Sequence, residues 1–178
     1  MFIGDAKKRS KFKNRVEKFN KLPDECKELF FEIADIEGFE SADLYLSEVL
    51  EYSEECESPI EALMLMGLCF VDIRTNKGYP FMDIEPQVEV ECEDKTYRVD
   101  FMIHSYPPDR LGEIVVAVEC DGHNFHEKTK EQVRKNNERD FALKMRGIEV
   151  LHFSGSEIYE SPIGCAIKVA KYIESRGK

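Results

Sequence analysis

Three acidic residues lie in two apolar segments in the second half of the chain. Asp100 is part of the alternating segment T-Y-R-V-D-F-M-I, and Glu119 and Asp121 come at the end of an apolar run that begins at Ile114. An unpaired carboxylate in a buried strand costs so much free energy that it needs a cation, a hydrogen-bonding partner or a proton. Because several carboxylate oxygens together suit hard divalent cations, the pattern predicts a site for Mg²⁺ or Mn²⁺.

Alternation of side chains along a strand predicts which residues share a face. In the first segment we expect Asp100 to lie with Arg98 and Met102, opposite a wholly apolar face that comprises Tyr97, Val99, Phe101 and Ile103. In the second, Ala117, Glu119 and Asp121 share one face, opposite Val116, Val118 and Cys120. Two of the acids also have a non-functional explanation. Asp121 and Gly122 form a common turn dipeptide, and Asp100 could be a surface residue of a half-exposed strand.

A helix, three strands, a helix, a strand and a last helix are predicted to position these acids, starting at Ser58. The sequence S-P-I-E at 58–61 is typical of a helix start, because serine caps, proline suits the first position and glutamate follows three residues after the cap. Strands are expected over 84–92, 96–103, 114–120 and 148–153, and a helix over 127–146 that ends at Gly147. The run over 114–120 is typical of a strand covered on both faces.

Residues 1–57 are expected to form an N-terminal helical extension to a domain over 58–178. Its predicted helices cover 5–21, a segment from Pro23 to the stop at Gly38, and a segment from a cap at Ser41 or Asp43 to Glu55. The first of these helices is basic. It could contact a DNA backbone, bind a protein partner or a second copy of the chain, or simply face solvent.

The net charge of −11 argues against a nucleic-acid partner only if the charge is evenly distributed. Residues 1–21 carry +6 and residues 122–178 carry +3, whereas residues 22–60 carry −12 and residues 61–121 carry −8. Phosphate binding requires a local basic face rather than a basic whole. The composition therefore leaves nucleic-acid binding open.

Two further features concern the compartment. No apolar run approaches the ~20 residues that span a bilayer, and the N-terminus lacks a signal-peptide pattern, so we expect a cytoplasmic protein without a membrane partner. None of the six cysteines forms a C-x-x-C pair, and most of them are expected to be small buried apolar residues rather than zinc ligands.

The segment from Ser58 to Cys165 resembles the PD-(D/E)XK, or restriction-endonuclease-like, superfamily, in particular the branch with very-short-patch-repair-like endonucleases. The resemblance is carried by S-P-I-E at 58–61, V-D-F at 99–101, V-E-C-D-G-H-N-F-H at 118–126, N-N-E-R-D at 136–140 and R-G-I-E-V-L-H-F-S-G-S-E-I at 146–158. It implies an α/β fold with an α-β-β-β-α-β-α core and a mixed sheet flanked by helices. It also implies an endonuclease that cleaves DNA with Mg²⁺ or Mn²⁺.

The resemblance implies a role for each residue that matches a motif. Asp100 would be the central metal-ligating aspartate and Glu119 the second acidic ligand, and Glu61 matches the glutamate of the first helix that often completes the site. The superfamily usually has a lysine two residues after the second acid, and here that residue is Asp121.

The absent lysine leaves the group that orients or deprotonates the attacking water to be supplied by other residues. Histidines that follow the Asp-Gly turn take part in the related branch, so His123 and His126 are the expected substitutes, with Lys128 and Lys130 as further candidates. His152, in the strand V-L-H-F, is expected to be a satisfied core residue.

The helix after the acids could provide a nucleic-acid-binding surface. Gln132, Asn136 and Arg139 form a polar row at helical spacing, and Lys130 and Arg134 add positive charge to the same helix. Arg139 could contact a phosphate or, equally, hold a carboxylate. A second row is expected to pack on the sheet and comprises Val133, Asn137, Phe141 and Met145.

Two other functions remain open at this level. The chain could be a nuclease-fold module that binds nucleic acid or assembles with a partner but lacks catalysis, which the missing lysine and the acidic total favour. It could also be a hydrolase of RNA. The presence of Glu61, Asp100 and Glu119 together favours catalysis.

Overall fold

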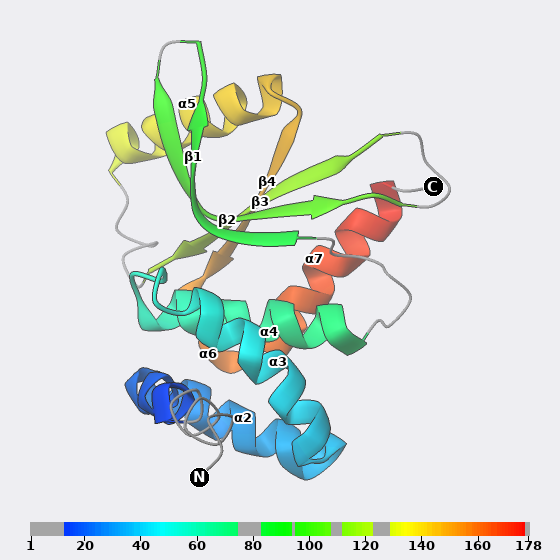
Figure 1. Cartoon of the computed structure of the whole chain (residues 1–178). Helices are drawn as coiled ribbons and strands as arrows, with labels where there is room; N and C mark the ends of the chain where they lie inside the picture. The colour runs from blue at the N-terminus through cyan, green and yellow to red at the C-terminus, as the bar shows by residue number, and fades with distance from the viewer. Residues whose placement is uncertain (1–12, 75–82, 94, 108–111, 123–128, 177–178) are drawn as a thin grey trace, which may run out of the picture.

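The computed structural model describes residues 13–74, 83–93, 95–107, 112–122 and 129–176, which form a four-stranded sheet with helices on both faces (Figure 1). The strands are β1 (Asp83–Glu91), β2 (Thr96–Ser105), β3 (Ile114–Asp121) and β4 (Ile148–Ser154). They lie in that order; β2 pairs antiparallel with both β1 and β3, and β4 pairs parallel with β3. The prediction of an α/β fold with a mixed sheet flanked by helices is confirmed.

The helices agree with the expected order, with two differences in detail. Residues 13–21 are helical, followed by α2 (Asp24–Glu37), α3 (Phe39–Tyr52), α4 (Pro59–Arg74), α5 (Lys130–Met145), α6 (Gly155–Glu160) and α7 (Pro162–Arg176). The predicted cap of α3 at Ser41 or Asp43 is wrong, because the helix starts directly after Gly38, whose φ of 86° turns the chain. The short α6 was not expected, and its start is fixed by a capping box between Ser154 and Glu157.

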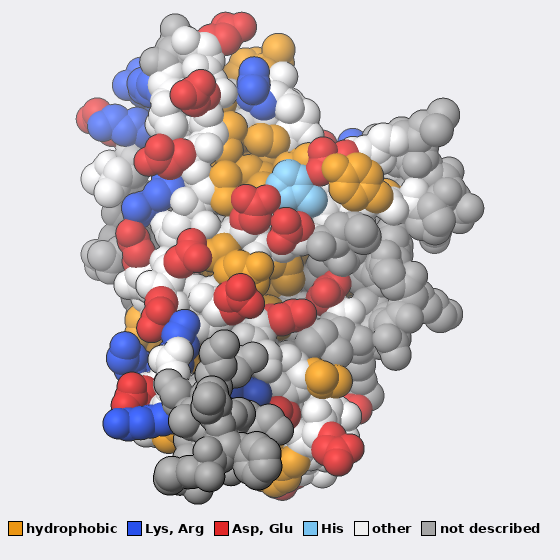
Figure 2. Space-filling model, in the orientation of Figure 1, with side chains coloured by type: hydrophobic (Ala, Val, Ile, Leu, Met, Phe, Trp, Pro, Cys, Tyr) orange, Lys and Arg blue, Asp and Glu red, His pale blue; other side chains and the backbone are white. Residues whose placement is uncertain are grey.

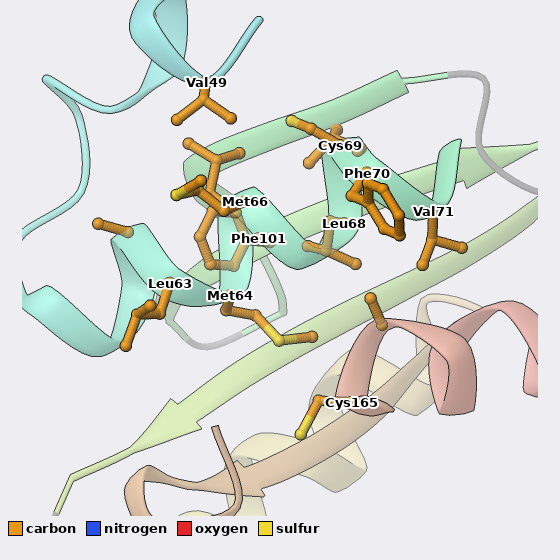
Figure 3. Packing of buried hydrophobic residues seen from close by; sticks show 14 of the residues in the cluster. Val49, Leu63, Met64, Met66, Leu68, Cys69, Phe70, Val71, Phe101 and Cys165 are labelled. Carbon is orange, nitrogen blue, oxygen red and sulfur yellow. The ribbon is translucent and has the colours of Figure 1, made fainter. Parts of the chain in front are cut away.

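Helix α4 is the centre of the main hydrophobic core. It packs between the sheet, α7 and α3, and Met64, Met66 and Leu68 are fully buried near Phe101 of β2 (Figure 3). Helices α2 and α3 contribute to the same core cluster, so the expected extension packs directly on this part of the domain. Gly67 permits the closest approach, since a Cβ there would lie 2.4 Å from the backbone oxygen of Pro162 at the start of α7.

Among the described elements, α5 covers the opposite face of the sheet, which has a much smaller core. Its buried cluster comprises Val99, Met102, Ala117, Leu143 and Ile148, of which Leu143 alone belongs to α5. The prediction that the row with Phe141 and Met145 packs on the sheet is wrong, because these side chains are 66% and 72% exposed. The helix instead directs Leu143 inward together with Arg139, one turn earlier, which reaches a carboxylate of the sheet.

The β1–β2 hairpin changes faces along its length, and Figure 1 shows it as a strong bend. In β2, Phe101 and Ile103 belong to the core beneath α4, whereas Val99 belongs to the cluster beneath α5. In β1, Ile84 packs with the first core, whereas Val88 packs with the second. The expected continuous apolar face of β2 is therefore wrong, since simple alternation would place Val99 and Phe101 on one side.

The change of face occurs at Gln87 and Asp100. Register pairs join Pro86 to Phe101 and Val88 to Val99, but no pair joins Gln87 to Asp100 between them. Gln87 has a φ of 53° and is the only non-glycine residue with positive φ in the described part of the chain. The backbone at this position therefore reverses which face of the sheet the following side chains of each strand occupy, and it bends the hairpin.

Two of the expectations about the compartment can be compared with the structure. Of the helices within the described ranges, none has both the length and the apolar character needed to cross a membrane. All six cysteines lie in described residues and are free thiols, and Cys26, Cys69 and Cys165 are buried as small core residues.

Candidate functional site

Asp100 and Glu119 lie where β2 separates from β3. The register of these strands ends at the pair Phe101 and Val118, so the next two residues, Asp100 and Glu119, are not joined by the ladder. The side chain of Asp100 replaces the missing backbone partner, because the backbone N–H of Cys120 donates to its Oδ2 at 2.7 Å. The fold thus brings the two predicted acids to one position in the sheet.

Burial makes the negative charge of both acids costly. Glu119 is 7% exposed, and burial is the main cause that raises its pKa to about 7, with the charge of Asp100 adding to the effect and the nearby Arg139 opposing it. Burial also raises the pKa of Asp100, against the hydrogen bond from Cys120. Both carboxyl groups would therefore gain from a bound cation.

Glu119 is only partly compensated by the protein. Its Oε2 lies 3.1 Å from Nη2 of Arg139 on α5. Its Oε1 is buried and has no hydrogen-bond partner among the described residues. A buried oxygen of this kind normally has a partner, so this atom marks a place where a cation or a donor would be stabilising.

Glu61 reaches the same region from the first turn of α4. It is 7% exposed, and its carboxylate accepts hydrogen bonds from the backbone N–H of Glu57 at 2.7 Å and from Oγ of Ser58 at 2.6 Å. A third bond comes from Nε2 of Gln87 at 2.9 Å. Glu61 therefore helps to start the helix as predicted, and its charge also contributes to the raised pKa of Asp100.

Asp121 takes part in a chain of contacts that ties the sheet to α5. Its Oδ2 lies 3.0 Å from Nδ1 of His152, whose Nε2 lies 3.0 Å from Oδ2 of Asp140. Asp140 also lies 3.6 Å from Nε of Arg139. The hydrogen bond with Asp121 is the main cause that raises the pKa of His152, so the imidazolium form is favoured between these two carboxylates.

The residues predicted to bind nucleic acid have different environments. The guanidinium of Arg139 pairs with the carboxylates of Glu119 and Asp140. Gln132 caps α5, since its Oε1 accepts the backbone N–H of Thr129 at 2.7 Å. Arg134 forms an exposed pair with Glu138 at 3.6 Å, and Lys130 is exposed. The predicted catalytic residues His123, His126 and Lys128 lie outside the described residues.

The donor atoms fit a hard divalent cation in their chemistry. Asp100, Glu119 and Glu61 offer carboxylate oxygens, which are the ligands that Mg²⁺ and Mn²⁺ prefer. The unpartnered Oε1 of Glu119 is available in the same region. Within the described ranges, however, no three or more His, Cys, Asp or Glu side chains are grouped closely enough to hold a metal ion.

Three residues of the region did not stand out as functional in the sequence. His152 was expected to be a satisfied core residue, and Asp140 and Gln87 carried no prediction. For Gln87 a signal existed, because the preceding Pro86 marks an edge strand or an irregular position within an alternating strand. For Asp140 and His152 no spacing rule could link a residue of a helix to a residue of a strand 12 positions later.

Charge is unevenly spread over the surface. Figure 2 shows one face on which acidic side chains occupy the middle, whereas Lys and Arg side chains gather mainly along one margin, on the left. No protein-family model, curated protein or solved structure matches the chain. A functional assignment therefore depends on the geometry of the site.

Proposed function

We propose that the protein is a metal-dependent endonuclease that hydrolyses DNA phosphodiester bonds. One observation carries the proposal: Asp100 and Glu119 are two buried carboxyl groups at the point where two strands separate, and burial raises the pKa of both. The ion pair of Glu119 with Arg139 uses only Oε2 of the carboxylate. Here one buried oxygen of Glu119 has no partner among the described residues.

The arrangement of elements supports a restriction-endonuclease-like core. Helix α4 precedes an antiparallel β1–β2–β3 unit, and α5 then leads to β4, which pairs in parallel with β3. This agrees with the order and the mixed sheet that the resemblance implies. The acids also lie on the elements where that superfamily carries its ligands.

In this proposal the ligands of Mg²⁺ or Mn²⁺ are Asp100, Glu119 and Glu61, whose side chains would have to approach one another on binding, since they are not grouped around one point in the described part of the structure. The bound cation would lower the pKa of a water molecule and neutralise charge on the scissile phosphate. The backbone N–H of Cys120 fixes Asp100, and three hydrogen bonds fix Glu61. These contacts preorganise the carboxylates, which is where the protein contributes most to such a site.

His152 supports the proposal because of its charge. It is the register partner of Glu119 on the adjacent strand, and two carboxylates favour its protonated form. A positive charge beside the acids is what the absent lysine would otherwise supply. We assign this electrostatic role to His152 within the proposed nuclease, and leave the water-orienting role to the residues that follow Gly122.

One contact favours a second candidate, a nucleic-acid-binding or assembly module without catalysis. The guanidinium of Arg139 already pairs with Glu119, and Asp121 replaces the usual lysine. An arginine can take the place of a cation at a carboxylate, so this arrangement is compatible with a lost metal site.

The test is cleavage of supercoiled plasmid DNA with Mg²⁺ or Mn²⁺ by the wild type and by Asp100→Asn. This change preserves an oxygen that can accept the N–H of Cys120, so it removes the charge with little effect on folding. Asp83→Asn is the matched control, because Asp83 is an exposed residue at the start of β1. We expect cleavage by the wild type and by the control, and a rate at least ~100-fold lower for Asp100→Asn.

Two outcomes would contradict the proposal. One is no cleavage of any DNA form by the wild type, and the other is equal cleavage by wild type and Asp100→Asn. A parallel assay with a single-stranded and a hairpin RNA separates the hydrolase of RNA from the DNA enzyme. Binding of DNA without cleavage would favour the non-catalytic module.

A further inference from the structure

Gln87 has an unfavourable backbone conformation at the bend of the β1–β2 hairpin. Its φ of 53° lies in the left-handed region, which residues with a long side chain rarely adopt because Cβ approaches the carbonyl oxygen. Strained residues of this kind persist where the surroundings fix them, and they concentrate at functional sites. The conformation therefore requires an explanation beyond the turn of the chain.

The position of Gln87 places it beside the proposed ligands. It is the residue opposite Asp100 between two register pairs, and opposite residues of antiparallel strands are close neighbours on the sheet. Its Nε2 donates to Oε2 of Glu61 at 2.9 Å. Gln87 thus lies opposite one proposed ligand and binds a second.

The carbonyl oxygen of the Gln87 amide makes no hydrogen bond to the described residues. Oε1 of Gln87 is buried and has no hydrogen-bond partner among the described residues. An amide needs both ends satisfied when it is buried, and its carbonyl oxygen is also a suitable ligand for a hard cation. Oε1 of Glu119 is unpartnered in the same way, so Gln87, opposite Asp100, and Glu119 each carry a buried acceptor oxygen without a partner among the described residues.

We propose that Gln87 belongs to the cation site: its Nε2 positions Glu61, and its Oε1 is a neutral oxygen ligand of the cation. The inference rests on the proposed function, since it assumes that Asp100 and Glu119 bind Mg²⁺ or Mn²⁺. The irregular position in the hairpin would then contribute to the site, because Gln87 lies opposite Asp100 while its amide reaches Glu61 of α4.

The test is calorimetric titration of Mn²⁺ into the wild type, Gln87→Met, Gln87→Asn and Asp100→Asn. Methionine has a similar length without the amide. Asparagine preserves the amide and tolerates positive φ, but it is one methylene too short to serve both partners. We expect Mn²⁺ binding to weaken about 10- to 100-fold in both Gln87 variants, as for other residues that support a metal site.

A thermal unfolding midpoint for each variant separates the site role from a structural one. A residue that only joined the hairpin to α4 would lower the midpoint on substitution and leave the Mn²⁺ affinity of the folded protein unchanged. In the wild type, addition of Mg²⁺ should also shift the NMR signals of the Gln87 side-chain amide, a measurement that needs no variant.

The outcomes distinguish this inference from the proposed function. If Asp100→Asn abolishes Mn²⁺ binding while both Gln87 variants bind as the wild type does, the inference on Gln87 is overturned and the cation site stands. Unchanged amide signals on addition of saturating Mg²⁺ overturn it equally. If the wild type binds no cation, both are overturned.

Discussion

The two faces of the sheet are built in different ways. The face beneath α4 and α7 packs a large apolar core in which Phe101, Met64 and Leu65 are fully buried. The face beneath α5 has a small apolar cluster and also holds charged contacts, from Glu119 to Arg139 and from Asp121 through His152 to Asp140. The first face supplies stability, whereas the second holds ionisable groups in fixed positions.

The candidate site lies between these faces, where the hairpin passes from one to the other. Asp100 and Gln87 mark the change, and Glu61 reaches the same position from the helix of the apolar face. The site therefore borders a large apolar core on one side and charged contacts on the other. This difference yields tests that separate the two faces.

The largest effect is expected from removing a ring of the apolar face. Phe101→Ala should lower the free energy of unfolding by about 3–5 kcal/mol, because Phe101 is fully buried and a cavity would remain. The same change on the α5 side, Phe141→Ala, should alter it by less than about 0.5 kcal/mol, because that ring is 66% exposed. Urea unfolding measures both, and equal losses would contradict the contrast between the faces.

The order of elements could be predicted from the sequence, because it depends on local patterns. The cap at Ser58, the apolar run of β3 and the stop at Gly147 are local signals, and each gave an element close to its observed bounds. The rotation of α5 could not be predicted in this way. It is set by Leu143 and by the pairing of Arg139 with Glu119, a contact between residues far apart in the sequence.

The candidate site, too, could be predicted only as far as local sequence patterns allow. Asp100 and Glu119 could be predicted as neighbours because each lies in a strand of recognisable type. The inverted backbone at Gln87 could not, because alternation assumes a regular strand and a single residue with positive φ reverses it. The partners of His152 depend on the packing of α5 on β4, which no periodicity encodes.

The second prediction concerns pH and the charged face. The pKa of Glu119 is raised to about 7 in the folded protein, so the folded state binds the proton more tightly than the unfolded state does. Stability in the absence of a divalent cation should therefore fall as pH rises from about 4.5 to about 7, by up to about 3 kcal/mol, and then level off. Urea unfolding between pH 4.5 and pH 8 in a chelating buffer, at roughly half-unit steps, measures this loss.

Glu119→Gln identifies the source of this loss, since it removes the titrating group at nearly constant shape. Its stability should depend much less on pH over this range, with the raised pKa of His152 leaving a smaller loss in the same direction. Glu138→Gln, at an exposed position on α5, is the control and should retain the full dependence. An unaltered profile in Glu119→Gln would show that Glu119 titrates normally.

The smallest expected effect distinguishes two arginines of α5. Arg139→Ala should destabilise the protein by about 1–3 kcal/mol at pH 8, because it removes the charged partner of the buried Glu119. Arg134→Ala should cost less than about 0.5 kcal/mol, since its pair with Glu138 is exposed. The difference between the stability losses of the two variants should be smaller at pH 5, where Glu119 is protonated. If this difference in stability loss did not change with pH, Arg139 would contribute through packing alone.

The central claim is that the buried pair of Asp100 and Glu119 binds a divalent cation. Because the pKa of Glu119 is raised to about 7, the group is partly protonated at pH 7, and cation binding should release that proton fraction. Calorimetric titration of Mn²⁺ at pH 7, in two buffers of different ionisation enthalpy, measures that release directly. The account predicts Mn²⁺ binding with release of up to one proton in the wild type, an affinity that rises with pH, and no binding in Asp100→Asn. Absence of binding in the wild type, or binding without proton release, would contradict it.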